Sequence, residues 1–374
     1  MTPRESNVAR KQLTCRMRAV TLGMQGTGNP LLFFETSIRV RRESVMTGYR
    51  GWVVVLMLTI LAGTAAAGTT REDFRRPPPP AVDAATAART ALGQALFFDR
   101  RLSRNTSVAC ASCHLPSLGW TDRTARPFND TGSTMARRTL PTVNLSELPR
   151  LLWDGGFTSL EALIPAAIAN PAIMNLPHDQ LIPRLQGIPG YRPLFEAAFP
   201  GQPITIEAVT TALAAFQRSL ISARAPFDDW VDGADDAISA EARQGFALFS
   251  GRAGCTACHT GWAFTDGSFH DTGLPGTGDP GRGRLLPNSV KMQYAFRTPG
   301  LRDVALHPPY MHDGSLPTLN AVVDFYATGG EPRPSRADEI KSLSLSPDER
   351  QALVAFLISL TGRQDTPFTI PTAP

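Results

Sequence analysis

Apolar positions near the middle of the chain recur at the spacing of a helix face. Five large apolar side chains follow one another three or four positions apart: Ile206, Val209, Leu213, Phe216 and Leu220. Because an α-helix has about 3.6 residues per turn, this spacing places them on one face and predicts a helix there. No stretch beyond residue 67 sustains the alternation of apolar and polar positions that a half-buried strand shows. The pattern predicts an all-α protein.

A second helix, near the C-terminus, has clear start and stop signals. Ser346 offers an N-cap, Pro347 suits the first helical position, and Glu349 completes a capping box. Four apolar residues then share one face: Leu353, Phe356, Leu357 and Leu360. Gly362 is expected to stop this helix.

Three segments without helical spacing suggest how the chain is divided. Residues 75–80 contain four consecutive prolines and are expected to form a stiff leader. Residues 227–237 are acidic, contain a glycine and are interpreted as a linker between two domains, and residues 273–287 are a loop rich in glycine and proline. The expected parts are a leader over residues 68–84, an N-terminal domain over residues 85–230 and a C-terminal domain over residues 238–362.

The N-terminal region reads as a targeting segment. An apolar run at residues 51–63 follows Arg50 and precedes three alanines at 65–67, which matches a secretory signal peptide and its cleavage site. The run is too short to span a membrane. Residues 1–67 are therefore interpreted as an N-terminal extension and a signal peptide. We expect a periplasmic protein whose mature chain has no membrane span.

Removing this region changes the charge balance. Residues 68–374 hold 28 basic and 30 acidic residues, a net charge of −2, although the whole chain is basic. The mature chain therefore shows no sign of binding nucleic acid. Its 307 residues are enough for two domains of ordinary size.

Four of the five cysteines stand in two pentapeptides of the form C-x-x-C-H. These are residues 110–114 and residues 255–259. The motif predicts two covalent c-type haems, with thioether bonds to Cys110, Cys113, Cys255 and Cys258 and with His114 and His259 as proximal iron ligands. A zinc site of two C-x-x-C pairs is the alternative, but it would not need a histidine directly after each pair. The fifth, Cys15, lies in the N-terminal extension, so no disulfide framework is expected.

The two halves of the mature chain repeat one another around these motifs. The matched segments are residues 93–97 and 245–249, residues 120–122 and 264–266, and residues 153–156 and 312–315. Such a repeat predicts a duplicated unit with one haem in each half. Aligning Trp153 with His312 places Tyr326 opposite Ala167. The second haem can then receive a tyrosine oxygen as its other axial ligand, while the first receives nothing.

Two alternatives to this ligand remain open on the residues alone. Tyr326 can be a packed helix aromatic whose hydroxyl is satisfied elsewhere. Met311 can be the axial ligand in its place.

The order of the motifs resembles the bacterial di-haem cytochrome c peroxidase and MauG family. It runs through Leu92 to Asp99, the two C-x-x-C-H motifs, Trp153-Asp154-Gly155, Asn170-Pro171, residues 297–302 and residues 309–314. The resemblance implies two cytochrome-c-like helical domains. It further implies that one haem meets hydrogen peroxide while the other stores or relays an electron.

The resemblance also implies roles for single residues. Trp153 is the aromatic residue between the haems, although an ordinary core tryptophan is the alternative. Tyr326 stands where MauG-type enzymes have tyrosine and peroxidases have methionine, and Met311 stands where the family has no ligand. No histidine lies in residues 127–133, where many peroxidases carry one that blocks the first haem, so an open site is expected.

Other positions depart from the family pattern. Ile173 replaces the family's distal glutamate and Leu163 its glutamine, so the usual proton-transferring group is missing. For the family's inter-domain calcium, Pro309 matches a carbonyl donor and the asparagine position is Thr139, so a calcium site of oxygen ligands between the domains stays an open expectation. His178, His270 and His307 are expected to be surface or hydrogen-bonded residues rather than metal ligands.

These features predict a di-haem oxidoreductase that reduces hydrogen peroxide at the haem of His114. Electrons would be relayed through the haem of His259 from a small cytochrome c or a cupredoxin. MauG-like oxidation of residues in a protein partner is one alternative. Because Ile173 cannot transfer protons, a two-haem electron-transfer cytochrome without catalysis is another.

Overall fold

The computed structural model describes residues 69–79, 82–276, 278–363, 368–372 and 374. The predicted extension and signal peptide lie outside the described residues. Within the described ranges, no helix combines the length and the apolar character needed to cross a membrane.

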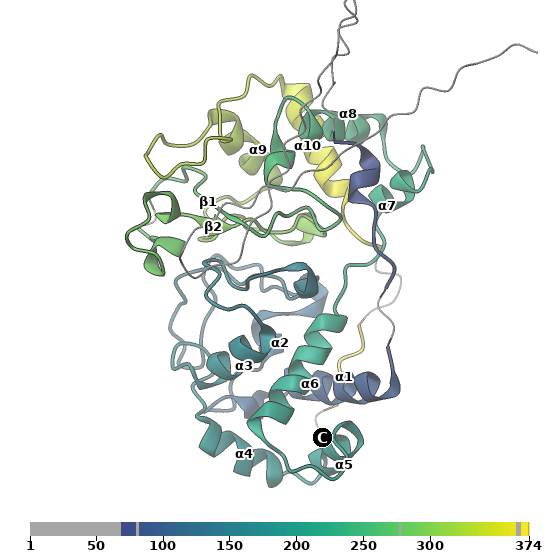
Figure 1. Cartoon of the computed structure of the whole chain (residues 1–374), viewed down its shortest axis with the longest axis vertical. Coiled ribbons are helices and arrows are strands. Elements are labelled where there is room, and N and C mark those ends of the chain that lie inside the picture. Colours follow the sequence, from purple (N-terminus) through teal and green to yellow (C-terminus); the bar gives the residue numbers. More distant parts are fainter. Residues whose placement is uncertain (1–68, 80–81, 277, 364–367, 373) are drawn as a thin grey trace, which may run out of the picture. The chain divides into compact units, whose positions relative to one another are not determined.

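Helices make up most of the regular structure of the described chain, as predicted (Figure 1). The α-helices are α1 (Ala84–Phe97), α2 (Cys110–Cys113), α3 (Leu160–Ala169), α4 (His178–Gln186), α5 (Tyr191–Ala198), α6 (Ile206–Ser219), α7 (Pro226–Val231), α8 (Ala240–Ser250), α9 (Leu319–Thr328) and α10 (Pro347–Ser359). Short 3-10 helices are η1 (Arg71–Phe74), η2 (Arg100–Leu102), η3 (Pro116–Leu118), η4 (Leu145–Glu147), η5 (Cys255–Ala257), η6 (Arg282–Arg284), η7 (Val290–Met292) and η8 (Val304–Leu306). Strands β1 (Phe269–His270) and β2 (Phe296–Arg297) pair antiparallel, with Phe269 opposite Arg297.

Two of these helices were predicted from the sequence. The apolar stripe between residues 206 and 220 forms α6 and is largely buried. In α10, the Ser346 hydroxyl accepts the Glu349 N–H at 3.2 Å, and the Glu349 carboxylate accepts the Ser346 N–H at 2.8 Å. The capping box is therefore confirmed, and the helix ends at Ser359, shortly before Gly362.

Buried apolar side chains form two separate cores, one in each half of the chain. The first runs from Leu92 to Leu220 and joins α1 with α3 to α6. The second runs from Phe227 to Leu360 and joins α7 to α10, together with Phe74 from η1.

The same helix crossing is built twice, once in each core. Figure 1 shows α1 lying against α6 and α8 against α10. A Cβ atom on Gly93 would lie 1.9 Å from the Ala212 carbonyl oxygen, and one on Gly245 would lie 1.9 Å from that of Ala352. Both crossings therefore require glycine, and the predicted repeat is present in three dimensions.

The segment interpreted as a linker belongs to the second core. Residues 226–231 form α7, and Phe227 is fully buried among the aromatic rings of that core. Asp228 forms a buried ion pair with Arg302 at 2.8 Å. The acidic residues suggested a solvated linker, but one of them is neutralised by an arginine far along the chain. The chain passes between the cores before α7 instead.

The proline-rich leader is also attached to the second core at its start. Phe74 is fully buried and stacks on Phe264, with ring centroids 4.5 Å apart. Arg75 pairs with Asp232, and Arg76 donates to the Ser222 carbonyl. The leader therefore contributes to the second core, although the first core follows it directly in the chain.

Replacing Gly93 with alanine is expected to destabilise the protein by at least about 2 kcal/mol, because the added methyl group overlaps a backbone oxygen. Chemical denaturation of the holoprotein measures this. Gly187→Ala is the matched control, since a Cβ atom there meets its nearest neighbours at 3.5 Å and the residue has ordinary φ. Equal unfolding midpoints for the two variants would contradict the close crossing.

Candidate haem sites

Each predicted proximal histidine is oriented by a backbone carbonyl. His114 follows α2, and its Nδ1 lies 3.3 Å from the Trp120 carbonyl oxygen. His259 follows η5, and its Nδ1 lies 2.9 Å from the Phe264 carbonyl oxygen. A carbonyl can only accept, so Nδ1 carries the proton in both rings and Nε2 is left to bind a metal. Both donor sets fit a haem iron.

Beside His259 lies a large apolar cavity. The empty space, including solvent at its mouth, is about 1850 Å³. Cys255 and Cys258 line the same space as His259. Much of the remaining wall is aliphatic: Leu301, Val304, Leu319, Val323, Leu353 and Leu357. An apolar cavity that presents one histidine and two cysteines suits a covalently attached haem.

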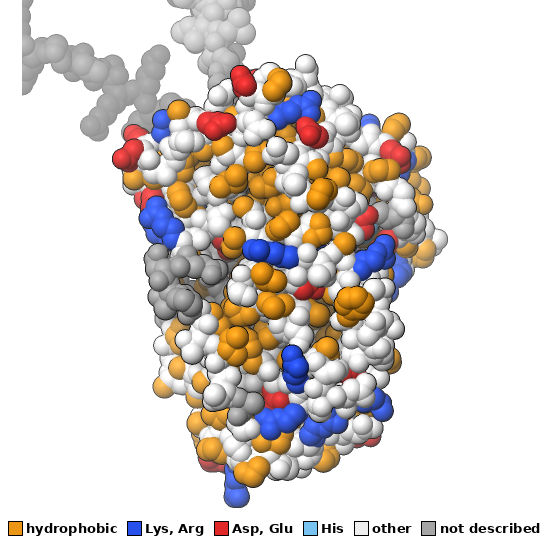
Figure 2. Space-filling view, turned by 180° about the vertical axis from the view of Figure 1, so that it is seen from behind, with side chains coloured by type: hydrophobic (Ala, Val, Ile, Leu, Met, Phe, Trp, Pro, Cys, Tyr) orange, Lys and Arg blue, Asp and Glu red, His pale blue; other side chains and the backbone are white. Residues whose placement is uncertain are grey.

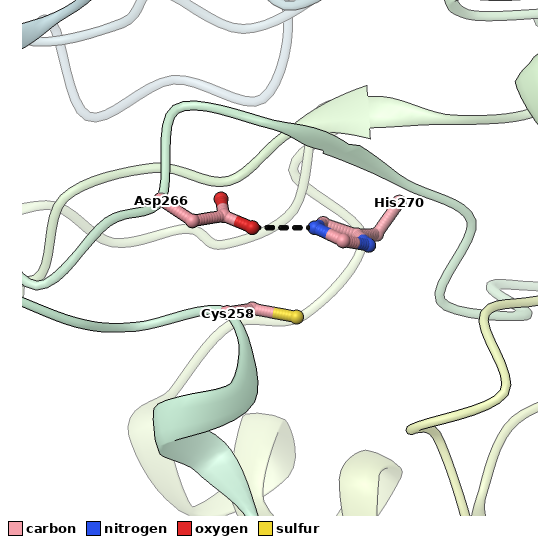
Figure 3. Close-up of side chains that lie close together, drawn as sticks. All are labelled: Cys258, Asp266 and His270. Carbon is pink, nitrogen blue, oxygen red and sulfur yellow. Dashed lines mark hydrogen bonds and ion pairs between the residues drawn. The ribbon is translucent and has the colours of Figure 1, made fainter. Parts of the chain in front are cut away.

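The cysteines do not assemble into the alternative zinc site. Within the described part of the chain, the one group of three potential metal-ligating side chains is Cys258, Asp266 and His270 (Figure 3). It contains one of the four thiols, so a site of four thiolates is not formed. His270 Nε2 lies 2.7 Å from the Asp266 carboxylate, and this hydrogen bond raises the pKa of His270 to about 10. A protonated histidine is a poor metal ligand, so we interpret the group as an ion pair.

The two candidate axial ligands of the second haem share its cavity. Tyr326 and Met311 both line the space beside His259. Burial raises the pKa of the Tyr326 phenol, and its hydroxyl makes no hydrogen bond to any described residue. The packed-aromatic alternative requires a hydroxyl satisfied elsewhere, and the described residues offer it no such partner.

The first half differs at the equivalent position. Ala167 in α3 and Tyr326 in α9 each lie seven residues after the first residue of their helix. The caps agree as well, because Ser159 accepts the Ala162 N–H and Thr318 accepts the Ala321 N–H. Ala167 has no donor atom, so α3 offers no side-chain ligand there.

Two side chains of the first half, Leu163 and Ile173, stand where the family pattern has proton-transferring groups, and neither can transfer a proton. Leu163 and Ile173 are partly buried and pack against the first core. Ile173 is fixed locally, since its N–H donates to Asn170 and its carbonyl accepts from Asp130. The two positions therefore present hydrocarbon where the family pattern has an amide and a carboxylate.

Trp153 comes from the first half but forms part of the wall of the cavity beside His259. It is buried, and its indole N–H donates to the Arg138 carbonyl at 3.0 Å. Its ring meets the ring of His312 edge-on, with centroids 6.4 Å apart. His312, its counterpart in the repeat, stacks on Phe296 at 3.6 Å. The two equivalent residues thus meet where the halves join.

Several residues at this junction were not singled out from the sequence. Arg137 binds Asp279 at 2.6 Å and Asp154 at 2.9 Å, which links the halves by ion pairs. Arg138 donates to the His307 carbonyl at 2.7 Å. These partners lie far apart in the chain, and the adjacent arginines were the one local signal.

The three histidines without assigned chemistry are hydrogen-bonded, as predicted. His178 Nε2 lies 2.9 Å from the Pro165 carbonyl oxygen, and His270 pairs with Asp266. His307 Nε2 lies 3.0 Å from the Gly119 carbonyl oxygen. Burial, with the nearby charge of Arg138, lowers the pKa of His307 to about 4, so it is neutral at pH 7.

Comparison with known proteins gives consistent matches. The family model described as di-haem cytochrome c peroxidase matches residues 87–236. The methylamine utilization protein MauG of Methylorubrum extorquens is 50% identical over 291 residues, which cover 77% of this chain and 82% of that relative. Cytochrome c551 peroxidase of Nitrosomonas europaea is 32% identical, covering 79% of this chain and 86% of that relative. The crystal structure of a MauG-like protein associated with microbial copper homeostasis has a TM-score of 0.73 and 27% identity, over 79% of this chain and 97% of that one.

We expect the protein, expressed with a c-type haem maturation system, to have the mass of the mature chain plus two haems. Replacing both Cys255 and Cys258 with alanine should remove one covalent haem, because those thiols line one cavity. Intact mass spectrometry measures both. A single haem in the unaltered protein, or bound zinc, would show that the cysteines have another role.

Proposed function

The chain belongs to the di-haem cytochrome c peroxidase and MauG family, and we propose that it is a periplasmic oxidoreductase that reduces hydrogen peroxide at its first haem. His114 and His259 would each bind one haem iron through Nε2. The bound haems would supply the redox chemistry, and the chain's residues would decide which iron stays open and how electrons reach it.

The observation that best supports this proposal is the difference between Ala167 and Tyr326 at one register of two equivalent helices. A tyrosine oxygen close to the second iron would fill its sixth position. The first iron would keep that position free for a small ligand such as peroxide. One closed and one open haem on the same scaffold suits a division between electron relay and peroxide reduction.

Trp153 is proposed as the aromatic residue through which electrons pass between the haems. Its ring belongs to the first half, lines the cavity of His259 and is held by the hydrogen bond to Arg138. A buried and fixed indole keeps its distance to both sites constant. The position of Trp153 counts against its being an ordinary core tryptophan, because the ring lines the cavity beside His259.

The electron donor is proposed to be a small cytochrome c or a cupredoxin. On the face shown in Figure 2, Lys and Arg side chains are scattered among Asp and Glu, with no field of a single sign. This face suits transient docking of a small redox protein and carries no continuous basic stripe of the kind that binds nucleic acid.

A second candidate function is peroxide-dependent oxidation of residues in a protein partner. The 50% identity to a methylamine utilization protein MauG and the tyrosine at position 326 favour it. The hydrocarbon at Leu163 and Ile173 favours a third, an electron-transfer cytochrome without peroxide chemistry. Peroxide turnover distinguishes the third candidate from the first two.

The resting ferric protein is expected to contain one high-spin and one low-spin haem, because one half offers an axial oxygen and the other does not. Electron paramagnetic resonance measures this. Tyr326→Phe should convert the low-spin signal into a high-spin signal, because it removes the axial oxygen. Met311→Leu, the matched control in the same cavity, should leave both signals unchanged. Two low-spin signals in the unaltered protein would show that both irons have a sixth ligand. A low-spin signal that is lost in Met311→Leu alone would show that Met311, and not Tyr326, is the axial ligand.

Restoring a carboxylate at Ile173 should speed the reaction with peroxide. General acid–base groups contribute roughly 10²- to 10⁴-fold, so Ile173→Glu is expected to react at least about 10-fold faster than the unaltered protein. Stopped-flow mixing with peroxide, followed at the haem Soret band, measures the rate. Ile173→Gln is the control, since it adds a polar group that cannot take a proton.

A fast reaction of the unaltered protein that Ile173→Glu does not improve would mean that another group transfers the protons. No reaction with peroxide in any variant, together with electron exchange with a small cytochrome, would favour the electron-transfer cytochrome.

A further inference from the structure

Arg138 lies where segments from both halves of the chain meet. Its backbone N–H donates to the His312 carbonyl at 2.9 Å, and its own carbonyl accepts the indole N–H of Trp153 at 3.0 Å. Its guanidinium donates to the His307 carbonyl at 2.7 Å. One residue of the first half therefore holds two segments of the second and also fixes Trp153.

The side chain of Arg138 is a buried positive charge. The residue is 6% exposed, and it forms no ion pair with any described residue. Burial lowers the pKa of Arg138 to about 10, with Asp122 and Tyr310 opposing the shift, so the guanidinium is charged at neutral pH. A buried charge is costly unless its polar atoms are bonded, so the bond to the His307 carbonyl is a strong constraint.

A negatively charged group in the cavity beside His259 could neutralise the part of this guanidinium that makes no hydrogen bond. The Nε atom is buried without a hydrogen-bond partner, and Arg138 lines the cavity of His259. A haem brings two propionate carboxylates into its cavity. A carboxylate there would neutralise the arginine without any metal ion.

The positions expected to hold an inter-domain calcium ion do not fit one. The Thr139 hydroxyl donates to the Asp122 carboxylate at 2.7 Å, and the Thr139 carbonyl accepts the Thr121 hydroxyl at 3.1 Å. Pro309 lies two residues after His307, whose carbonyl is bonded to the guanidinium. Calcium takes six to eight oxygen ligands, often carboxylates, and a neighbouring cation repels it.

The same contacts extend to the loop of the first haem. The His307 side chain reaches the Gly119 carbonyl at 3.0 Å, next to Trp120, whose carbonyl holds His114. The Arg138 bond to His307 therefore connects the second half with the loop that orients the first proximal histidine.

We propose that the guanidinium of Arg138 is the cation that joins the two haem domains, and that this protein binds no calcium ion between them. The hydrogen bond from the Arg138 guanidinium to the His307 carbonyl replaces a metal–carbonyl bond at this junction. This inference concerns the junction alone and does not depend on peroxide turnover.

Calcium content and sensitivity to a chelator test the proposal on the unaltered holoprotein. Purified without chelators and dialysed against calcium-free buffer, it should contain two irons and less than about 0.1 calcium per chain by elemental analysis. EGTA, and calcium added afterwards, should leave the melting midpoint and the electron paramagnetic resonance spectrum unchanged. About one calcium per chain, with a fall in midpoint on EGTA that calcium reverses, would overturn it.

Variants test the guanidinium itself. Arg138→Met should lower the melting midpoint by about 4 °C or more, because it removes a buried charged hydrogen bond, and Arg138→Lys should recover part of the loss. Arg123→Met is the matched control, since Arg123 donates to the Leu306 carbonyl across the same junction but is exposed. Equal midpoints for Arg138→Met and Arg123→Met would contradict the proposal. If Arg138→Met fails to fold, the calcium measurements decide alone.

Discussion

The hydrogen bond from each predicted proximal histidine to a backbone carbonyl is the constraint on which both candidate sites depend. Without it, either ring nitrogen could face the cavity. The accepting residues, Trp120 and Phe264, both have left-handed φ, at 63° and 55°, and a non-glycine residue keeps that conformation only when its surroundings hold it. The surroundings are aromatic: Phe264 stacks on Phe74, and Trp120 packs on Phe97, Phe216 and Phe368. Segments remote in sequence, including the leader and a part of the C-terminal tail, thus support the orientation of the imidazoles.

On this shared scaffold the two halves differ at a few side chains, and those differences are where function is expected. The helix crossings, the caps and the carbonyls that hold the two histidines are repeated, so they are common to both halves. Ala167 and Tyr326 occupy one register, and Trp153 and His312 occupy another. Because α3 and α9 have the same caps and register, exchanging one side chain would be enough, under the proposed function, to leave one haem site open and close the other. A duplicated fold would in this way separate peroxide binding from electron relay without a second architecture.

Features encoded locally could be predicted from the sequence, and features that depend on distant partners could not. The capping box of α10, the apolar face of α6 and the C-x-x-C-H motifs each lie within a few turns of chain, where spacing and residue type are sufficient. The acidic residues 227–237 suggested a linker because the partner of Asp228, Arg302, lies more than seventy positions away. The role of Phe74 was hidden for the same reason, since a single aromatic residue in a leader carries no sign of the core it enters.

Arg138 is the clearest example of a residue whose contacts could not be predicted from the sequence. A pair of adjacent arginines usually indicates a solvated surface, since both side chains are long and charged. Here Arg137 forms ion pairs across the junction, while Arg138 turns inward to a backbone carbonyl and contributes its own backbone groups to Trp153 and His312. Every residue has a backbone carbonyl, whatever its side chain, so no sequence motif could have revealed this contact. A junction in which a buried guanidinium binds a backbone carbonyl is therefore recognised only once the segments are placed beside one another.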